Sequence, residues 1–174
     1  MSNKMIEDAI NVLLKGDAQK NALDLVAHIR EGGTPGKKTG GITVVQWDEN
    51  EFMWFVKNEE EIVDLIYISG IDDDIVCPGP WTVWIRGDHI GEHEDGPVDD
   101  QTKEVAWAHV AICKPCSDDC NRGCQKIIFG KEFAKVCPDT LIFSNPDAET
   151  LSYIKKIREI RNNDIRKRFE KGKN

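Results

Sequence analysis

The 174-residue sequence lacks any long hydrophobic run, and its longest unbroken apolar stretch is Phe52–Val56. A helix that crosses a bilayer needs about 20 apolar residues, so we expect no membrane-spanning segment and no membrane partner. The N-terminal segment carries Glu7 and Asp8 where a secretory signal would be apolar. We therefore expect a cytoplasmic location.

The sequence also lacks internal repeats, low-complexity segments and any linker that would separate two cores. Hydrophobic residues make up 40% of the chain, and a chain of this length buries enough surface to form a core without disulfides. We expect one domain covering residues 1–174.

Basic side chains are scarce in the middle of the chain and crowded near its end. Residues 48–104 contain seventeen acidic and three basic residues, whereas residues 155–174 contain nine basic and three acidic ones. Phosphate binding needs a basic face, so the acidic middle is a poor nucleic-acid surface. We favour a basic tail drawn to acidic residues, within the chain or across a homodimer. Nucleic-acid contact through the tail is the second alternative.

Hydrophobic periodicity predicts an α+β fold, with N- and C-terminal helices packed on a mainly antiparallel sheet. Helices are expected near both ends of the chain, at residues 4–14, 17–31 and 146–170, and one or two helical turns are expected at residues 102–109. Strands are expected at 42–47, 52–56, 62–69 and 81–86, with short ones near 126–129 and 140–143. Asn145 is the expected N-cap of the last helix, and Pro146 suits its first position.

The first two strands are expected to form a hairpin. A loop of two or four residues pairs Trp47 with Phe52 and Val45 with Trp54, which places Trp47 and Trp54 on one face. Together with Trp81 they are candidates for the wall of an apolar ligand pocket. We favour the interpretation that these tryptophans belong to the core of the sheet.

Four cysteines lie within twelve residues, and this run is the strongest functional signal. They are Cys113, Cys116, Cys120 and Cys124, at spacings typical of thiolate metal sites. In intracellular proteins such clusters more often bind a metal than form disulfides. We expect a structural Zn²⁺ site with these four ligands, in which Cys137 or His109 could replace one member.

Three alternatives remain open for the cysteine run. An iron–sulfur cluster is less favoured because the spacing departs from the ferredoxin pattern and the intervening residues are polar. Thiol-redox chemistry is suggested by the C-x-P-C pair Cys113 and Cys116, but that motif needs a helix starting at its first cysteine. The cysteines could also be incidental thiols that bind no metal.

Two C-terminal segments resemble uncharacterised bacterial proteins that also carry cysteines upstream. The segments are Ile128–Phe133, continuing to Cys137, and Asn145–Leu151. The resemblance implies a bacterial origin and metal binding, and it implies no substrate. The sequence as a whole favours a small zinc-binding module, which binds or senses a partner, over an enzyme.

Overall fold

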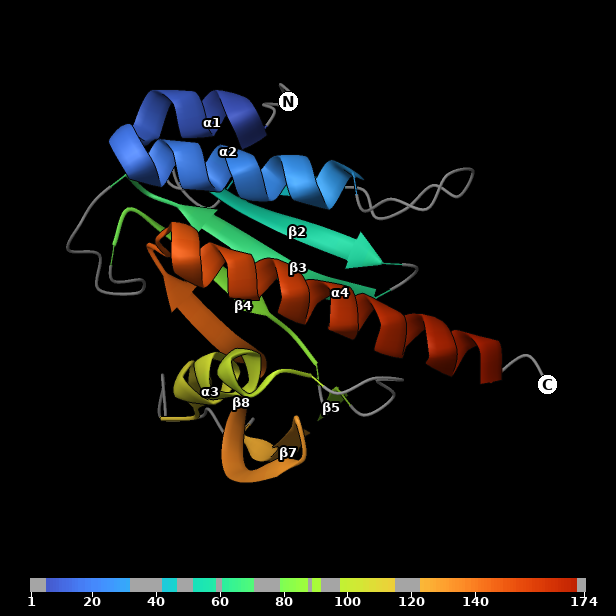
Figure 1. The fold of residues 1–174 in the computed structure, drawn as a ribbon. Helices are drawn as coiled ribbons and strands as arrows, with labels where there is room; N and C mark the ends of the chain where they lie inside the picture. Colours follow the sequence, from blue (N-terminus) through green and yellow to red (C-terminus); the bar gives the residue numbers. More distant parts are fainter. Residues whose placement is uncertain are drawn as a thin grey trace. The chain divides into compact units, whose positions relative to one another are not determined.

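The computed structural model describes residues 6–31, 42–46, 52–58, 61–70, 79–87, 89–91, 98–114 and 123–171. These residues form an α+β fold with helices beside a mainly antiparallel sheet, as predicted (Figure 1). Contacts group the chain into two compact units, which we describe separately. The first comprises Met1–Trp84 and Phe143–Lys155, and the second comprises Ile85–Ile142 and Lys156–Asn174. The expectation of a single domain stays a prediction.

The first unit begins with two helices, α1 (Ile6–Leu13) and α2 (Gly16–Glu31). An apolar stripe at helical spacing explains α1, in which Ile6, Ala9 and Ile10 are buried. Val12, which the pattern assigned to the same stripe, is 71% exposed. Glu7 of α1 and Arg30 of α2 join the helices through a two-pronged ion pair, with distances of 2.7 and 2.9 Å.

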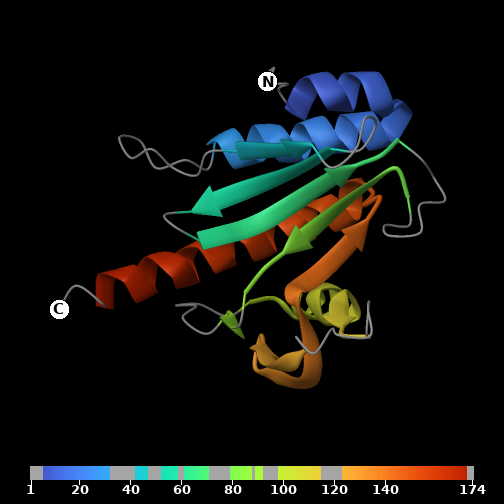
Figure 2. The same ribbon diagram turned by 180° about the vertical axis from the view of Figure 1, so that it is seen from behind.

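The sheet of the first unit has the strand order β1-β2-β3-β4, followed by the end of β8. The strands are β1 (Ile42–Gln46), β2 (Phe52–Asn58), β3 (Glu61–Ile68), β4 (Trp81–Ile85) and β8 (Lys131–Ser144). Its buried side chains include Trp54, Ile66, Ile68 and Trp81. Figures 1 and 2 show α2 and the beginning of α4 (Ala148–Lys171) on the same face of β2–β4.

The predicted register of the first hairpin is wrong by one residue. Trp54 pairs with Val44, and Phe52 pairs with Gln46. Five residues, 47–51, therefore separate Gln46 from Phe52 in the sequence, whereas the predicted hairpin loop has an even number of residues. Because side chains alternate between the two faces of a strand, this shift removes Val45 from the face of Trp54. Trp47 lies outside the described residues.

The second unit is built around the beginning of β8, with the strand order β8-β7-β5. Here β7 (Cys124–Ile128) is antiparallel to β8, β5 (His89–Ile90) is parallel to β7, and β6 (Val110–Ile112) also pairs with β8. Helix α3 (Asp100–Ala108) precedes β6. Asp99 caps α3 by accepting hydrogen bonds from the backbone N–H and the hydroxyl of Thr102, as a helix start requires.

A two-residue turn, Phe129-Gly130, joins β7 to β8. Ile128 pairs with Lys131, and both turn residues have positive φ angles, 47° and 76°. These angles define a type I′ turn, whose twist matches that of the strands. A bulky residue seldom adopts a positive φ, so the surroundings must hold Phe129 in place. Its N–H donates to Ile90 O at 2.8 Å, and its side chain is 9% exposed.

The C-terminal helix α4 begins two residues later than its predicted cap implied. Asp147 is the residue that caps it, because its Oδ1 accepts the N–H of Thr150 at 2.8 Å, and this N–H lowers the pKa of the Asp147 carboxyl. Asn145 has a φ of 43°, and its Oδ1 instead accepts a hydrogen bond from Trp81 Nε1. The expectation that Asn145 caps the helix and Pro146 opens it was therefore wrong.

Candidate metal centre

The first and last cysteines of the run lie at the ends of two strands that pair with the same part of β8. Cys113 directly follows β6, and Cys124 is the first residue of β7. Ile112 and Cys124 are both register partners of Val136. In addition, the Cys113 N–H donates to Lys135 O at 2.6 Å. Sheet pairing therefore fixes the backbone at both ends of the run.

Gly123 brings the two ends of the run into contact. A Cβ placed on Gly123 would lie 2.7 Å from Cys113 Cβ and 3.1 Å from Cys113 Sγ. Real Cβ atoms do not approach other atoms as closely as the first of these distances, so Gly123 permits a contact that any other residue would prevent. Cys113 consequently lies against the residue that immediately precedes Cys124.

The two proposed substitute ligands differ in where the structure places them. Cys137 follows Val136 on β8 and is therefore adjacent to the register partner of Cys124. The thiols of Cys113, Cys124 and Cys137 are not joined by disulfides.

His109 lies between α3 and β6 and faces another part of β8. Its carbonyl accepts the N–H of Ile142, seven residues along β8 from Lys135, and its Nδ1 is 2.8 Å from Val105 O. The structure thus brings Cys137 to the cysteine run and does not bring His109 there.

The middle members of the predicted ligand set, Cys116 and Cys120, lie outside the described residues. Within the part of the chain that the structure describes, no group of three His, Cys, Asp or Glu side chains could hold a metal ion. The donor set itself suits Zn²⁺, which binds thiolates in tetrahedral sites. Lys114 and Lys135, both exposed, add positive charge beside Cys113, the first residue of the run.

A buried polar cluster anchors β7 two residues after Cys124. Lys126 is 1% exposed, and its Nζ donates to Thr140 Oγ1 at 2.8 Å and to Gly87 O at 3.2 Å. Thr140 Oγ1 also lies 2.6 Å from Gly87 O and accepts the Gly87 N–H at 3.2 Å. Because buried polar groups are costly to leave unpaired, this cluster fixes the start of the β7–β8 hairpin.

The candidate apolar pocket depended on three tryptophans, of which two are described. Trp54 and Trp81 are both fully buried in the first unit. Trp47 lies outside the described residues, so the expected shared face of Trp47 and Trp54 stays a prediction. The buried positions of Trp54 and Trp81 support the favoured interpretation that they belong to the core.

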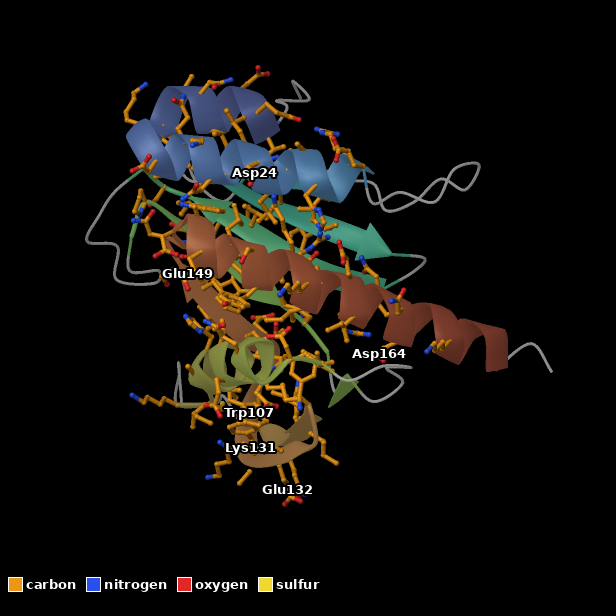
Figure 3. The ribbon with its side chains drawn as sticks, viewed as in Figure 1. Asp24, Trp107, Lys131, Glu132, Glu149 and Asp164 are labelled. Carbon is orange, nitrogen blue, oxygen red and sulfur yellow. The ribbon has the colours of Figure 1, made fainter. Side chains whose placement is uncertain are left out.

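Several basic side chains of α4 are held within their own unit. In the first unit Lys155 Nζ lies 2.7 Å from Asp24 Oδ2 (Figure 3 labels Asp24). In the second unit Lys156 Nζ lies 3.6 Å from Asp99 Oδ2. Arg158 and Arg161 are each 5% exposed. The pair of Lys156 with Asp99 joins the basic tail to the acidic middle of the same chain, as the charge pattern led us to favour.

Sequence reasoning missed an aromatic site on the second unit. The Lys131 ammonium lies 4.7 Å from the centroid of the Trp107 ring and 5.4 Å from that of Phe133 (Figure 3). The alternation of Lys131 and Phe133 on one strand was readable from the sequence. Their meeting with Trp107 of α3 depends on a tertiary contact that no local pattern encodes.

Comparisons with known proteins add no assignment. No protein-family model, curated protein or solved structure matches the chain. Among the described helices, none is long and apolar enough to cross a membrane.

Proposed function

We propose that this protein is a zinc-binding module in which the metal is structural, with Cys113, Cys116, Cys120 and Cys124 as ligands. The observation that supports this proposal is the contact between Cys113 and Gly123, because it brings the two ends of the cysteine run together. A metal bound there would connect the end of β6 to the beginning of β7. Its binding energy would then stabilise the fold of this region directly.

The contribution of the metal would be structural because a four-thiolate site leaves no coordination position open for substrate. The module would accordingly act by binding or sensing a partner, and the chain's residues suggest no reaction at this site. Cys124 is exposed, so a metal bound to it would lie where a partner or an oxidant could reach it.

Elemental analysis of protein purified without added metal tests the proposal. We expect about one zinc per chain, as a single four-ligand site requires. Cys124→Ser should lower the zinc content to well below half of the wild-type value. Cys77→Ser, which changes a cysteine outside the predicted ligand set and its substitutes, is the control and should retain zinc, whereas loss of zinc in Cys137→Ser would place Cys137 among the ligands. Metal-free wild-type protein, or iron in place of zinc, would overturn the proposal.

Hydrogen exchange tests the structural role of the metal separately. The Cys113 N–H bonds to Lys135 O, so its exchange reports whether β6 remains paired with β8 at this point. Chelation should accelerate exchange at Cys113 while leaving the amide of Ile142, which bonds to His109 O, unchanged. Equal exchange at Cys113 with and without chelator would show that the metal does not support this pairing.

The thiol-redox alternative has one observation in its favour, which is that β6 ends immediately before Cys113 as the strand of a C-x-P-C motif would. Alkylation distinguishes it from zinc binding. Zinc-bound thiolates react slowly until a chelator is added, whereas a redox-active cysteine reacts rapidly at neutral pH.

A further inference from the structure

Two aromatic rings from different elements converge on a single ammonium group in the second unit. Trp107 belongs to α3, Phe133 belongs to β8, and the Lys131 ammonium lies over both rings (Figure 3). Both distances, 4.7 and 5.4 Å, fall within the roughly 6 Å range of cation–π attraction. The rings thus present two electron-rich faces to the same position in space.

Contacts that do not involve the lysine side chain fix the Trp107 ring and the strand that carries Phe133. Trp107 Nε1–H donates to Ile128 O at 2.7 Å, and Ile128 is fully buried. Ile128 immediately precedes the Phe129-Gly130 turn, which fixes where β8 begins. Phe133 lies two residues after Lys131 on β8 and therefore on the same face of the strand. The site would keep its two walls if Lys131 moved away.

The site is open to solvent and has an acidic neighbour. Lys131 is exposed, while Trp107 and Phe133 are half-buried, so the ring faces can be reached from outside. Glu104 is exposed and lies one helical turn before Trp107, which places it on the same side of α3. A carboxylate at that position favours the approach of a cation.

We propose that Trp107 and Phe133 form a binding site for ligands that carry a methylated ammonium group, and that Lys131 occupies this site in the free protein as an internal competitor. A methylated ammonium group is less strongly hydrated than a primary one, so it gains more from aromatic faces, which are its usual recognition surface. The group could be carried by a small molecule or by a trimethylated lysine side chain. This proposal does not depend on metal binding.

Titrations followed by NMR at the Trp107 indole N–H test the proposal. The probes are choline and a short peptide containing Nε-trimethyl-lysine, and the unmethylated peptide is the control. We expect a saturable shift with at least one methylated probe and a weaker response to the unmethylated peptide. Binding of choline alone would identify a small-molecule site, and binding of the peptide alone would identify a modified protein chain.

Three variants distinguish a ligand-binding site from a cation–π contact that only stabilises the β7–β8 hairpin. Lys131→Ala removes the competitor and should tighten binding about two- to fivefold, as expected from the strength of exposed cation–π contacts. Lys135→Ala, which removes another exposed lysine of β8, should leave affinity unchanged. Phe133→Leu keeps an apolar side chain but removes one ring, and it should weaken binding at least threefold.

The proposal is overturned if neither methylated probe gives a saturable shift, or if Lys131→Ala binds no more tightly than the wild type. An unchanged affinity in Phe133→Leu would also overturn it. Far-ultraviolet circular dichroism serves as the folding control, since each variant should keep the wild-type spectrum.

Discussion

Two glycines with nearly equal backbone angles differ in the space around them, and alanine at each gives a controlled test of packing. Gly91 has a φ of 78° and Gly130 a φ of 76°. A Cβ on Gly91 would overlap Phe129 Cδ1 and force movement, whereas a Cβ on Gly130 would meet nothing within 4 Å. Both positions belong to the second unit.

The expected cost follows from these surroundings. An alanine at a positive φ loses about 1–2 kcal/mol of stability at either position. Gly91→Ala additionally pushes against the Phe129 ring, and forcing extra atoms into a packed site costs roughly 1–3 kcal/mol. We therefore expect Gly130→Ala to destabilise the protein by about 1–2 kcal/mol and Gly91→Ala by about 2–5 kcal/mol.

Urea unfolding followed by far-ultraviolet circular dichroism measures both free energies of unfolding. In a Phe129→Leu background, the extra cost of Gly91→Ala should shrink, because the smaller side chain can retreat from the new Cβ. The cost of Gly130→Ala should stay the same in that background. Equal losses for the two alanine variants would refute the claim that Phe129 packs against Gly91 and that this contact holds the strained turn.

Three further predictions concern other parts of the molecule. Adding EDTA should lower the unfolding temperature of the wild type but not that of Cys124→Ser, as calorimetry would show; equal shifts in both would exclude a role for this thiol. Thr140→Val should destabilise the protein by about 2–4 kcal/mol, because it leaves the buried Gly87 N–H and a donor of Lys126 unpaired, while Thr140→Ser should be much milder in chemical denaturation. The hydrogen bond from Arg30 lowers the pKa of Glu7, so this pair should stabilise the fold above the ordinary glutamate pKa and lose its effect as the pH falls through the lowered value. The effect should be below about 1 kcal/mol because the pair is largely exposed, and Glu7→Gln should abolish this part of the pH dependence; an NMR titration of Glu7 with an ordinary midpoint would contradict it.

The helices and most strands could be predicted because their apolar side chains recur with the period of the element. The buried stripe of α4 illustrates this, since Leu151, Ile154 and Ile157 are all buried. The register of the β1–β2 hairpin could not be predicted in the same way. It depends on whether the loop has an odd or an even number of residues, and the polar segment between the two strands fits either choice.

The capping residue of α4 could not be predicted either. Asn145 and Asp147 are both good capping residues, and sequence alone does not say which one is already engaged elsewhere. Trp81 Nε1 donates to Asn145, which leaves the capping role to Asp147. Strand β8 is also longer than the short strand predicted near 140–143, because it continues through Cys137-Pro138.

The cysteines of the candidate metal centre could be predicted from the sequence, but their place in the fold could not. Spacing alone indicated the run, whereas the meeting of its ends depends on β6 and β7 pairing with the same part of β8. The glycine at position 123 was visible in the sequence, yet its importance appears only when Cys113 lies against it.

The contact between Cys113 and Gly123 has a thermodynamic consequence for any ion that enters the loop. Bringing together the ends of a flexible segment of about ten residues costs roughly 2 kcal/mol in chain entropy. In the folded protein the hydrogen bonds of the sheet already hold the two ends together, so ion binding does not incur this loss of chain entropy. A synthetic peptide spanning residues 113–124 should therefore bind Zn²⁺ about 30-fold more weakly than the proposed site in the intact protein.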